Sequence, residues 1–368
     1  MTTVSLIVPP RTWTDKIEED RKKSEPESLF VNNNETTFVG ILIDDEVEPR
    51  RKMMEGLQPL LTSMKIFGLY FDPPSKDAGD EKSRKWNAYR IYAVTVVILS
   101  WINAVRIFSV FTREDAFGLA LFNKLLAVSF FVQCAVSQTT FFAASYSGRL
   151  AVVLEQILDD PCVRHARKFS VAYAALAWGI IMTVLTFYTY GLLFTDGSSD
   201  YYLAPLQIHV AMPNPLISRL IASGSFLHML SAYTFSQATT FVLAMIFSHQ
   251  FRKVSETLER FLVSDGKRRA GLGESDIEML RQQHQQISMN ISHVDDCLMF
   301  ANASAFCCQV FTLVILLYSL IFYHSLFADA VVITGYFFKM LAVSFGLVLT
   351  AAGGITVHHY VSVFTHNT

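Results

Sequence analysis

The sequence is poor in charge. Asp, Glu, Lys and Arg make up 17% of its 368 residues, against roughly 25% in soluble proteins. Basic and acidic residues nearly cancel, at 30 and 32, so the chain lacks the basic surplus of a nucleic-acid-binding protein. The low charge, together with 30 Phe, also argues against a cytosolic globular enzyme.

Sequence signals of catalysis, cofactor binding and secretion are lacking too. The five cysteines include no CxxC pair and no Cys/His metal spacing, so we expect neither a metal site nor a disulfide framework. The sequence contains no HExxH, P-loop or GxSxG motif. We therefore predict no enzymatic activity and no cofactor. The start, MTTVSLIVPPRTW, lacks the basic residues and apolar core of a signal peptide, so the N-terminus should stay in the cytosol.

What the sequence does contain is long apolar segments. There are six, each able to hold the ~20 residues that cross a bilayer as a helix. None of them contains Asp or Glu. The fold class we predict is an all-α, polytopic helical membrane protein with six transmembrane helices. The segments are residues 91–111, 118–145, 170–194, 216–248, 298–327 and 330–357.

Lys and Arg are distributed unevenly between the connections. The N-terminal region and two alternate loops hold 25, whereas the three other loops hold one, Arg113. Because basic residues stay on the cytoplasmic side, the N-terminus is predicted to be cytoplasmic. A G-protein-coupled receptor has the opposite orientation, and that class is excluded.

The N-terminal 88 residues form the polar part of the chain. We predict a disordered cytoplasmic tail over residues 1–50, because this stretch is rich in charged residues and Asn. Residues 51–72 repeat apolar residues at three- and four-residue steps, which predicts an amphipathic helix. Its basic residues could place it on the inner membrane surface.

The connection 249–297 has helical periodicity of its own. It predicts two cytoplasmic helical extensions that leave the membrane side by side, each with an apolar stripe. The stripes could pack on each other as an antiparallel pair, or they could contact neighbouring subunits. The residues that would make a subunit contact are Phe251, Leu258, Phe261, Ile277, Leu280, His284 and Ile287.

The segment that runs from Leu280 through His284 and Leu298 into FANASAFCCQVFTLVILLYSLIF resembles the fifth span of the arthropod gustatory receptor family. LQPLLTSMKIFGLYFDPP is similar to that family's opening helix. The resemblance covers about residues 55–366. It implies a seven-span receptor that assembles as a tetrameric ligand-gated cation channel. It also implies an anchor domain built by the cytoplasmic ends of spans four to six.

The sequence departs from the family pattern at its end. Residues 358–368 form a predicted cytoplasmic segment, and the family's seventh span, with a Thr-Tyr and Gln-Phe signature, does not follow. We expect an incomplete chain that stops before this helix. The alternative is a protein that lacks the helix and cannot build the family's pore from its own residues.

Ligand recognition is the chemistry that remains. In the family's fold the ligand cavity lies among spans two to six, toward the outside. A small organic molecule needs an apolar cavity with a few polar groups that orient it, and aromatic residues supply stacking surfaces. Aromatic residues also pack helices, so each assignment competes with a structural role. The candidate ligand residues are Phe130, Gln133, Tyr188, His228, Tyr233, Tyr336 and Lys339.

Lys339 is the most informative of these, because a charge deep in a membrane is costly. It lies about nine residues into its span, too deep for easy access to the surface. We therefore expect it to face the cavity. Arg219, Arg106 and Lys124 lie near span ends and are expected to reach the interface.

The function predicted from these features is a gustatory chemoreceptor subunit in the plasma membrane. It would open a non-selective cation path when a small tastant binds. Its expected partners are the tastant, membrane lipids and related subunits in a homo- or hetero-tetramer, without nucleic acid. Two alternatives stay open: a non-conducting regulatory or scaffold subunit, and a small-solute transporter, although no internal repeat is evident.

Overall fold

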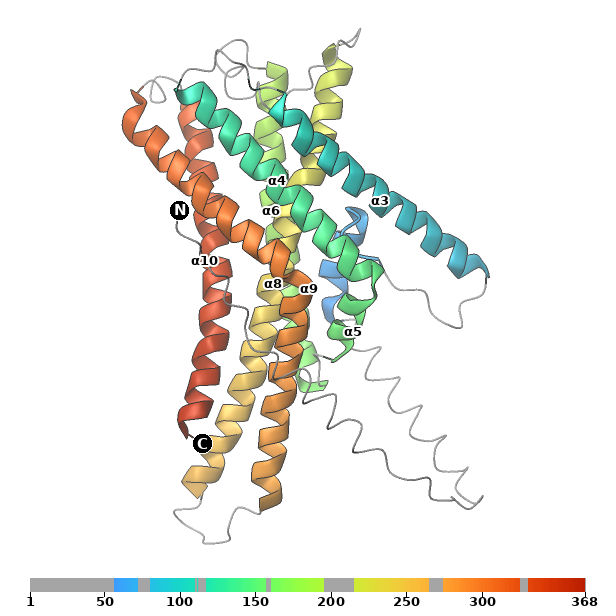
Figure 1. Ribbon diagram of the computed structural model, residues 1–368, viewed down its shortest axis with the longest axis vertical. Coiled ribbons are helices and arrows are strands. Elements are labelled where there is room, and N and C mark those ends of the chain that lie inside the picture. The colour runs from blue at the N-terminus through green and yellow to red at the C-terminus, as the bar shows by residue number, and fades with distance from the viewer. Residues whose placement is uncertain are drawn as a thin grey trace, which may run out of the picture. The chain divides into compact units, whose positions relative to one another are not determined.

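A computed structural model describes residues 56–71, 80–109, 111, 117–156, 160–194, 215–264, 274–324 and 330–367. All of them belong to one compact unit, Pro49–Thr368. The predicted tail 1–50 lies outside the described residues. The described residues are all-helical, as predicted (Figure 1). The labelled helices are α3 (Asp80–Phe108), α4 (Leu119–Tyr146), α5 (Arg149–Gln156), α6 (Asp160–Phe194), α8 (Pro215–Ser264), α9 (Glu274–Phe322) and α10 (Ala330–Asn367).

Six of these helices contain a stretch long and apolar enough to cross a membrane, which confirms the predicted number within the described residues. Helices dominate because a bilayer offers no water to the backbone, so each span must satisfy its hydrogen bonds internally. The stretches are Ala88–Phe108, Leu119–Tyr146, Ala166–Tyr190, Arg219–Arg260, Glu278–Phe322 and Ile333–Ala351.

Helices α8 and α9 are far longer than a membrane requires. With 50 and 49 residues, each rises about 75 Å, against a hydrocarbon core of about 30 Å. Proline is tolerated at the start of α8, because Pro215 occupies the first helical position and its missing N–H has no helical partner there. Helix α10 continues to Asn367, so the predicted segment 358–368 is largely a continuation of the sixth helix.

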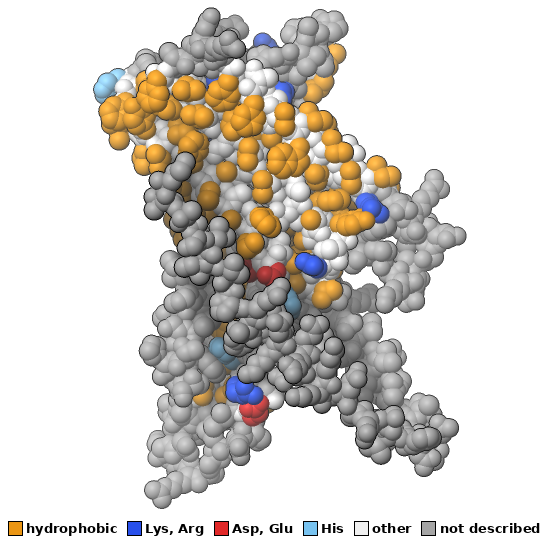
Figure 2. Space-filling model, in the orientation of Figure 1, with side chains coloured by type: hydrophobic (Ala, Val, Ile, Leu, Met, Phe, Trp, Pro, Cys, Tyr) orange, Lys and Arg blue, Asp and Glu red, His pale blue; other side chains and the backbone are white. Residues whose placement is uncertain are grey.

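The end of the bundle where α4, α8 and α10 begin is called the outer end here, after the orientation that the basic residues predict. Figure 2 shows hydrophobic side chains covering the upper part of the visible face, over α4 and α9. Many large apolar side chains are exposed there, including Phe306, Phe311 and Val314 of α9. Such a surface suits contact with lipid chains.

Helix α8 is the central helix of the bundle. Two thirds of its most apolar stretch is buried (67%), whereas the corresponding fraction is 17% for α10. It contacts α4, α6, α9 and α10. Helix α8 is therefore largely enclosed by four other helices, whereas most of the apolar stretch of α10 is not buried.

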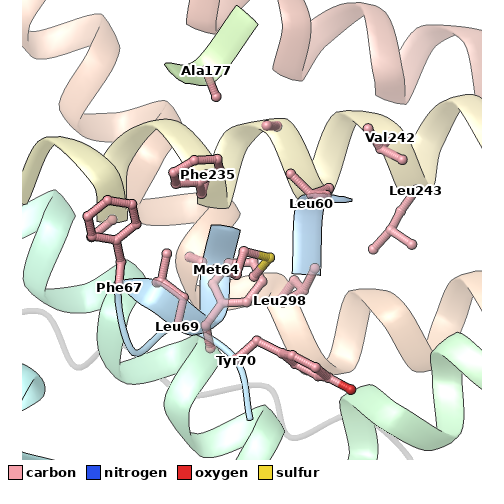
Figure 3. Packing of buried hydrophobic residues seen from close by; sticks show 14 of the residues in the cluster. Leu60, Met64, Phe67, Leu69, Tyr70, Ala177, Phe235, Val242, Leu243 and Leu298 are labelled. Atoms are coloured by element: carbon pink, nitrogen blue, oxygen red, sulfur yellow. The ribbon is translucent and has the colours of Figure 1, made fainter. Parts of the chain in front are cut away.

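Residues 56–71, called the buried segment below, fill the inner half of the bundle. Their helix ends just before Gly68, whose φ of 69° would strain the backbone of a residue with a side chain. The Gly68 N–H donates to the Lys65 carbonyl, and the Leu69 N–H donates to the Met64 carbonyl, which is a Schellman ending. The apolar stripe packs against Phe235 of α8 and Leu298 of α9 (Figure 3). The face that membrane-surface binding would use is thus covered by protein.

The extensions of α8 and α9 pack against each other within the chain. The rings of Phe251 and His284 lie 5.4 Å apart. Phe251, Leu280 and Ile287 are buried within the chain itself. The two antiparallel helices thus pack parts of their apolar stripes on each other, and the subunit contact stays a prediction. Leu258 packs against the same core. The side chains of Phe261 and Ile277 lie outside the described residues.

Candidate ligand site in the outer half

Three of the predicted ligand residues are joined by a row of aromatic rings. Tyr188 of α6 stacks on Phe226 of α8 with ring centroids 4.1 Å apart. Phe226 contacts Phe130 of α4 at 5.7 Å, and Phe130 contacts Tyr233 of α8 at 5.9 Å. The row, defined as Tyr188, Phe226, Phe130 and Tyr233, thus crosses three helices. Phe226 and Tyr233 share one face of α8 because they are seven residues apart.

A buried polar cluster lies at the inner end of this row. It consists of Tyr233 and Gln237 of α8 and Gln309 of α9, which converge on Gly346 of α10. The Tyr233 hydroxyl interacts with the side chains of both glutamines, although no hydrogen bond of normal geometry reaches its oxygen. Neutral amides and a phenol can donate and accept hydrogen bonds without the cost of burying a charge.

Gln133 is a buried residue of α4. It is 2% exposed, three residues beyond Phe130, and its Nε2 has no hydrogen-bond partner among the described residues. A buried amide donor without a partner is costly. This residue is therefore a candidate for orienting a polar ligand.

His228 lies on a different face of α8 from Tyr233. Its ring contacts Phe67 of the buried segment at 5.7 Å, in an edge-to-face arrangement. Its Nδ1 has no hydrogen-bond partner among the described residues. The structure therefore separates His228 from the row and brings it to the interface with the inner half.

Tyr336 and Lys339 follow one another on the inward face of α10. Tyr336 is fully buried, donates a hydrogen bond to Asn123 Oδ1 of α4, and packs in a second cluster with Phe122, Leu126, Ile315 and Leu316. Lys339 is partly buried one turn deeper, between this cluster and Gly346.

Arg106 of α3 adds a second cation near the row. It interacts electrostatically with Tyr188. The sequence placed Arg106 at a span end, where a basic side chain can reach the interface, so this contact with the row was missed. Asn103, one turn away, donates a hydrogen bond to Ser225 of α8 at 2.7 Å and ties α3 to this region.

A hollow of about 420 Å³ lies on another face of α10, apart from the row and the cluster. None of the seven predicted ligand residues lines it. Its lining residues are Thr334, Phe337, Phe338, Met340, Leu341 and Ser344.

The arrangement of these helices matches a known fold. The chain has the fold of an insect olfactory receptor. The structure of the receptor OR5 from Machilis hrabei is similar with a TM-score of 0.60 and 13% identity, covering 86% of this chain and 82% of that one. Its structure in complex with eugenol is similar with a TM-score of 0.57 and 14% identity, covering 86% and 84%. No family model and no curated protein matches the sequence.

Other residues of the outer half were not predicted as ligand contacts. They are Asn123, Gln237, Gln309 and Arg106. Helical spacing could have pointed to Gln237, because it shares the face of α8 that carries Phe226 and Tyr233. Gln309 carried no such signal, since its position opposite Gly346 depends on how α9 and α10 pack.

The chemistry of the outer half suits recognition of a neutral organic molecule. Aromatic rings offer stacking faces, and amides and hydroxyls offer hydrogen bonds. Within the described residues, no group of three His, Cys, Asp or Glu side chains comes together that could hold a metal ion.

Proposed function

We propose that this chain is a chemoreceptor subunit of the gustatory class, which binds a small neutral organic molecule and opens a cation path. The observation that carries the proposal is the likeness to the insect olfactory receptor OR5 over 86% of the chain. The resemblance of residues 55–366 to gustatory receptors supports the taste class. The charge distribution supports a cytoplasmic N-terminus, and a receptor for external molecules belongs in the plasma membrane.

The ligand is proposed to bind along the aromatic row and to use Gln133 and Lys339 as polar contacts. Eugenol, the molecule named with one structure of OR5, is a neutral phenol. A molecule of this kind has a ring that can stack on Tyr188 and Phe130 and a hydroxyl that an amide can bind. Eugenol is therefore a suitable first probe, together with sugars and alkaloids.

The test is electrophysiological. The full chain is expressed in oocytes, alone and with a related receptor subunit, and currents are recorded while eugenol, sugars and alkaloids are applied. A ligand-evoked cation current from the chain alone supports a channel subunit of a homomeric assembly. A current that appears only with the related subunit supports a heteromeric assembly. Uptake of labelled solute without current would instead favour a transporter and contradict the proposal.

The site has its own test in Tyr188→Leu. Loss of the stacked ring should raise the half-maximal agonist concentration about tenfold, which corresponds to about 1.4 kcal/mol. Tyr190→Leu is the control, because Tyr190 is exposed on the same helix. Equal potency of both variants, at equal surface expression, would remove the aromatic row from the site. Lys339→Met is also expected to change the agonist potency, because it removes a proposed polar contact with the ligand.

A further inference from the structure

Helix α10 comes close to α8 and α9 at Gly346. A Cβ atom at this position would lie 2.6 Å from Gln237 Oε1, 2.8 Å from Gln309 Nε2 and 3.3 Å from the Tyr233 hydroxyl. A methyl group at this position would require the ends of the two glutamine side chains to shift. The α10 backbone therefore rests directly on three polar side chains.

These polar side chains are not well partnered in this arrangement. Gln309 is 1% exposed, and neither its Nε2 nor its Oε1 has a hydrogen-bond partner among the described residues. The Gln237 Nε2 and the Tyr233 hydroxyl also make no hydrogen bond of normal geometry, although the hydroxyl interacts with both glutamine side chains. Buried polar atoms without partners raise the free energy of the state that contains them.

Helix α10 is the least buried of the six candidate spans, whereas α8 beneath it is the most buried. Separating α10 from the cluster thus disturbs less packing than moving any face of α8. A separation by the width of one water molecule would let water reach the amides and the hydroxyl.

We propose that the contact of Gly346 with Tyr233, Gln237 and Gln309 is a two-state packing switch. In the packed state α10 gains van der Waals contact and leaves polar atoms without partners. In the released state the contact is lost and water satisfies those atoms. The free energies of the two states are close, because the packed state lacks hydrogen bonds to water and the released state lacks the van der Waals contact.

The switch is connected to the aromatic row through Tyr233. Its ring contacts Phe130 in the row, and its hydroxyl lies at Gly346. A molecule bound along the row can shift the switch if it contacts Tyr233 differently in the two states. In this respect the inference rests on the proposed function, and it adds to it that release of α10 accompanies channel opening.

Gly346→Ala tests the switch by adding bulk. The methyl group should destabilise the packed state, so hydrogen exchange in α10 peptides of the purified full-length protein becomes faster. The basal current should be higher and the agonist potency about tenfold greater, because the methyl group crowds the ends of the two glutamine side chains in the packed state. Gly224→Ala is the matched control, because a Cβ at Gly224 meets nothing within 4 Å.

Gln309→Met tests the switch in the opposite direction. It keeps the length of the side chain but removes the two polar atoms, which should stabilise the packed state. Hydrogen exchange in α10 should slow, the protein should unfold at a higher temperature, and potency should fall about tenfold. Gln283→Met is the control, because Gln283 is exposed on the same helix.

The proposed switch would be wrong if hydrogen exchange in α10 shifted in the same direction in Gly346→Ala and Gln309→Met, or if it were unchanged in both. Adding Gln237→Ala to Gly346→Ala should restore wild-type exchange, since it removes the atom nearest to the new methyl group. If Gly346→Ala does not fold, Gln309→Met alone tests the switch, because this substitution adds no branch to the side chain. Hydrogen exchange needs no current, so a chain that conducts nothing would contradict the proposed function and still test the switch.

Discussion

The inner and outer halves of the bundle treat their buried polar groups differently. In the inner half, side chains from several helices hydrogen-bond to the buried segment: Gln138 Nε2 donates to the Gly68 carbonyl at 2.8 Å, and Tyr92 donates to the Ile66 carbonyl at 2.6 Å. In the outer half, Gln133, Gln237 and Gln309 each contain a buried polar atom without a partner. In the inner half Gln138 Oε1 and Ser137 Oγ also lack a partner among the described residues, but the hydrogen bonds to the buried segment favour one arrangement of that half.

The two halves of the bundle thus differ in the roles that their polar groups can have. The buried segment acts as a fixed base, because Trp178 and Ser170 of α6 also hydrogen-bond to it, at 3.0 and 3.3 Å. The outer half keeps polar atoms available for a ligand or for water. The proposed receptor function would need both, since a ligand can shift a conformation only where two arrangements differ little in free energy.

The largest expected effect comes from breaking the fixed base with Phe67→Ala. Phe67 is 4% exposed and contacts Trp178, Phe235 and His228. Its truncation should cost about 3–5 kcal/mol of stability, as measured by unfolding of the full-length protein in detergent. The neighbouring Ile66 is 54% exposed, so Ile66→Ala should stay within about 0.5 kcal/mol. Similar losses from both would mean that the buried segment is not fixed as described.

A smaller effect is expected from Tyr336→Phe in the outer half. The variant removes the hydroxyl that donates to Asn123 and leaves the buried amide oxygen without it. The expected loss is about 1–3 kcal/mol by the same unfolding measurement. Adding Asn123→Leu should recover much of it, because no unpartnered acceptor then remains. An additive double variant would show that the two side chains do not depend on each other.

The smallest effect is expected outside both halves, from Glu278→Gln on the extension of α9. Glu278 accepts hydrogen bonds from Arg281 at 2.7 and 2.8 Å, but both side chains are exposed. An exposed pair on one helix contributes little, because water and salt screen the two charges. Unfolding at low and at high salt should show a small difference that salt removes. A loss as large as that of Tyr336→Phe, unaffected by salt, would point to a structural role of this pair that its exposure does not suggest.

Much of the fold followed from simple sequence patterns. The number of spans and the long extensions of α8 and α9 could be predicted because apolar length and helical periodicity are local properties. The apolar stripe of the buried segment was predicted for the same reason. Its location was not, since an amphipathic stripe can be covered by lipid or by protein, and periodicity does not distinguish them.

The candidate site was predicted only in part. Phe130, Tyr188 and Tyr233 meet in the row, because aromatic residues in the outer halves of three helices have few places to pack other than on one another. His228 was assigned to the same group but lies on another face of α8, which the angle between the helices decides. Gln309 escaped prediction because its significance depends on a glycine of a different helix.

Composition and the order of apolar segments were enough to determine a helical membrane protein, because the cost of exposing backbone and charge to lipid acts on each segment separately. Only the tertiary structure decided which side chains meet. The inward face of each helix, the burial of residues 56–71 and the contact of Gly346 with two glutamines all depend on packing between segments distant in the sequence. Such contacts are selected by the shape of the whole bundle, which no single segment encodes.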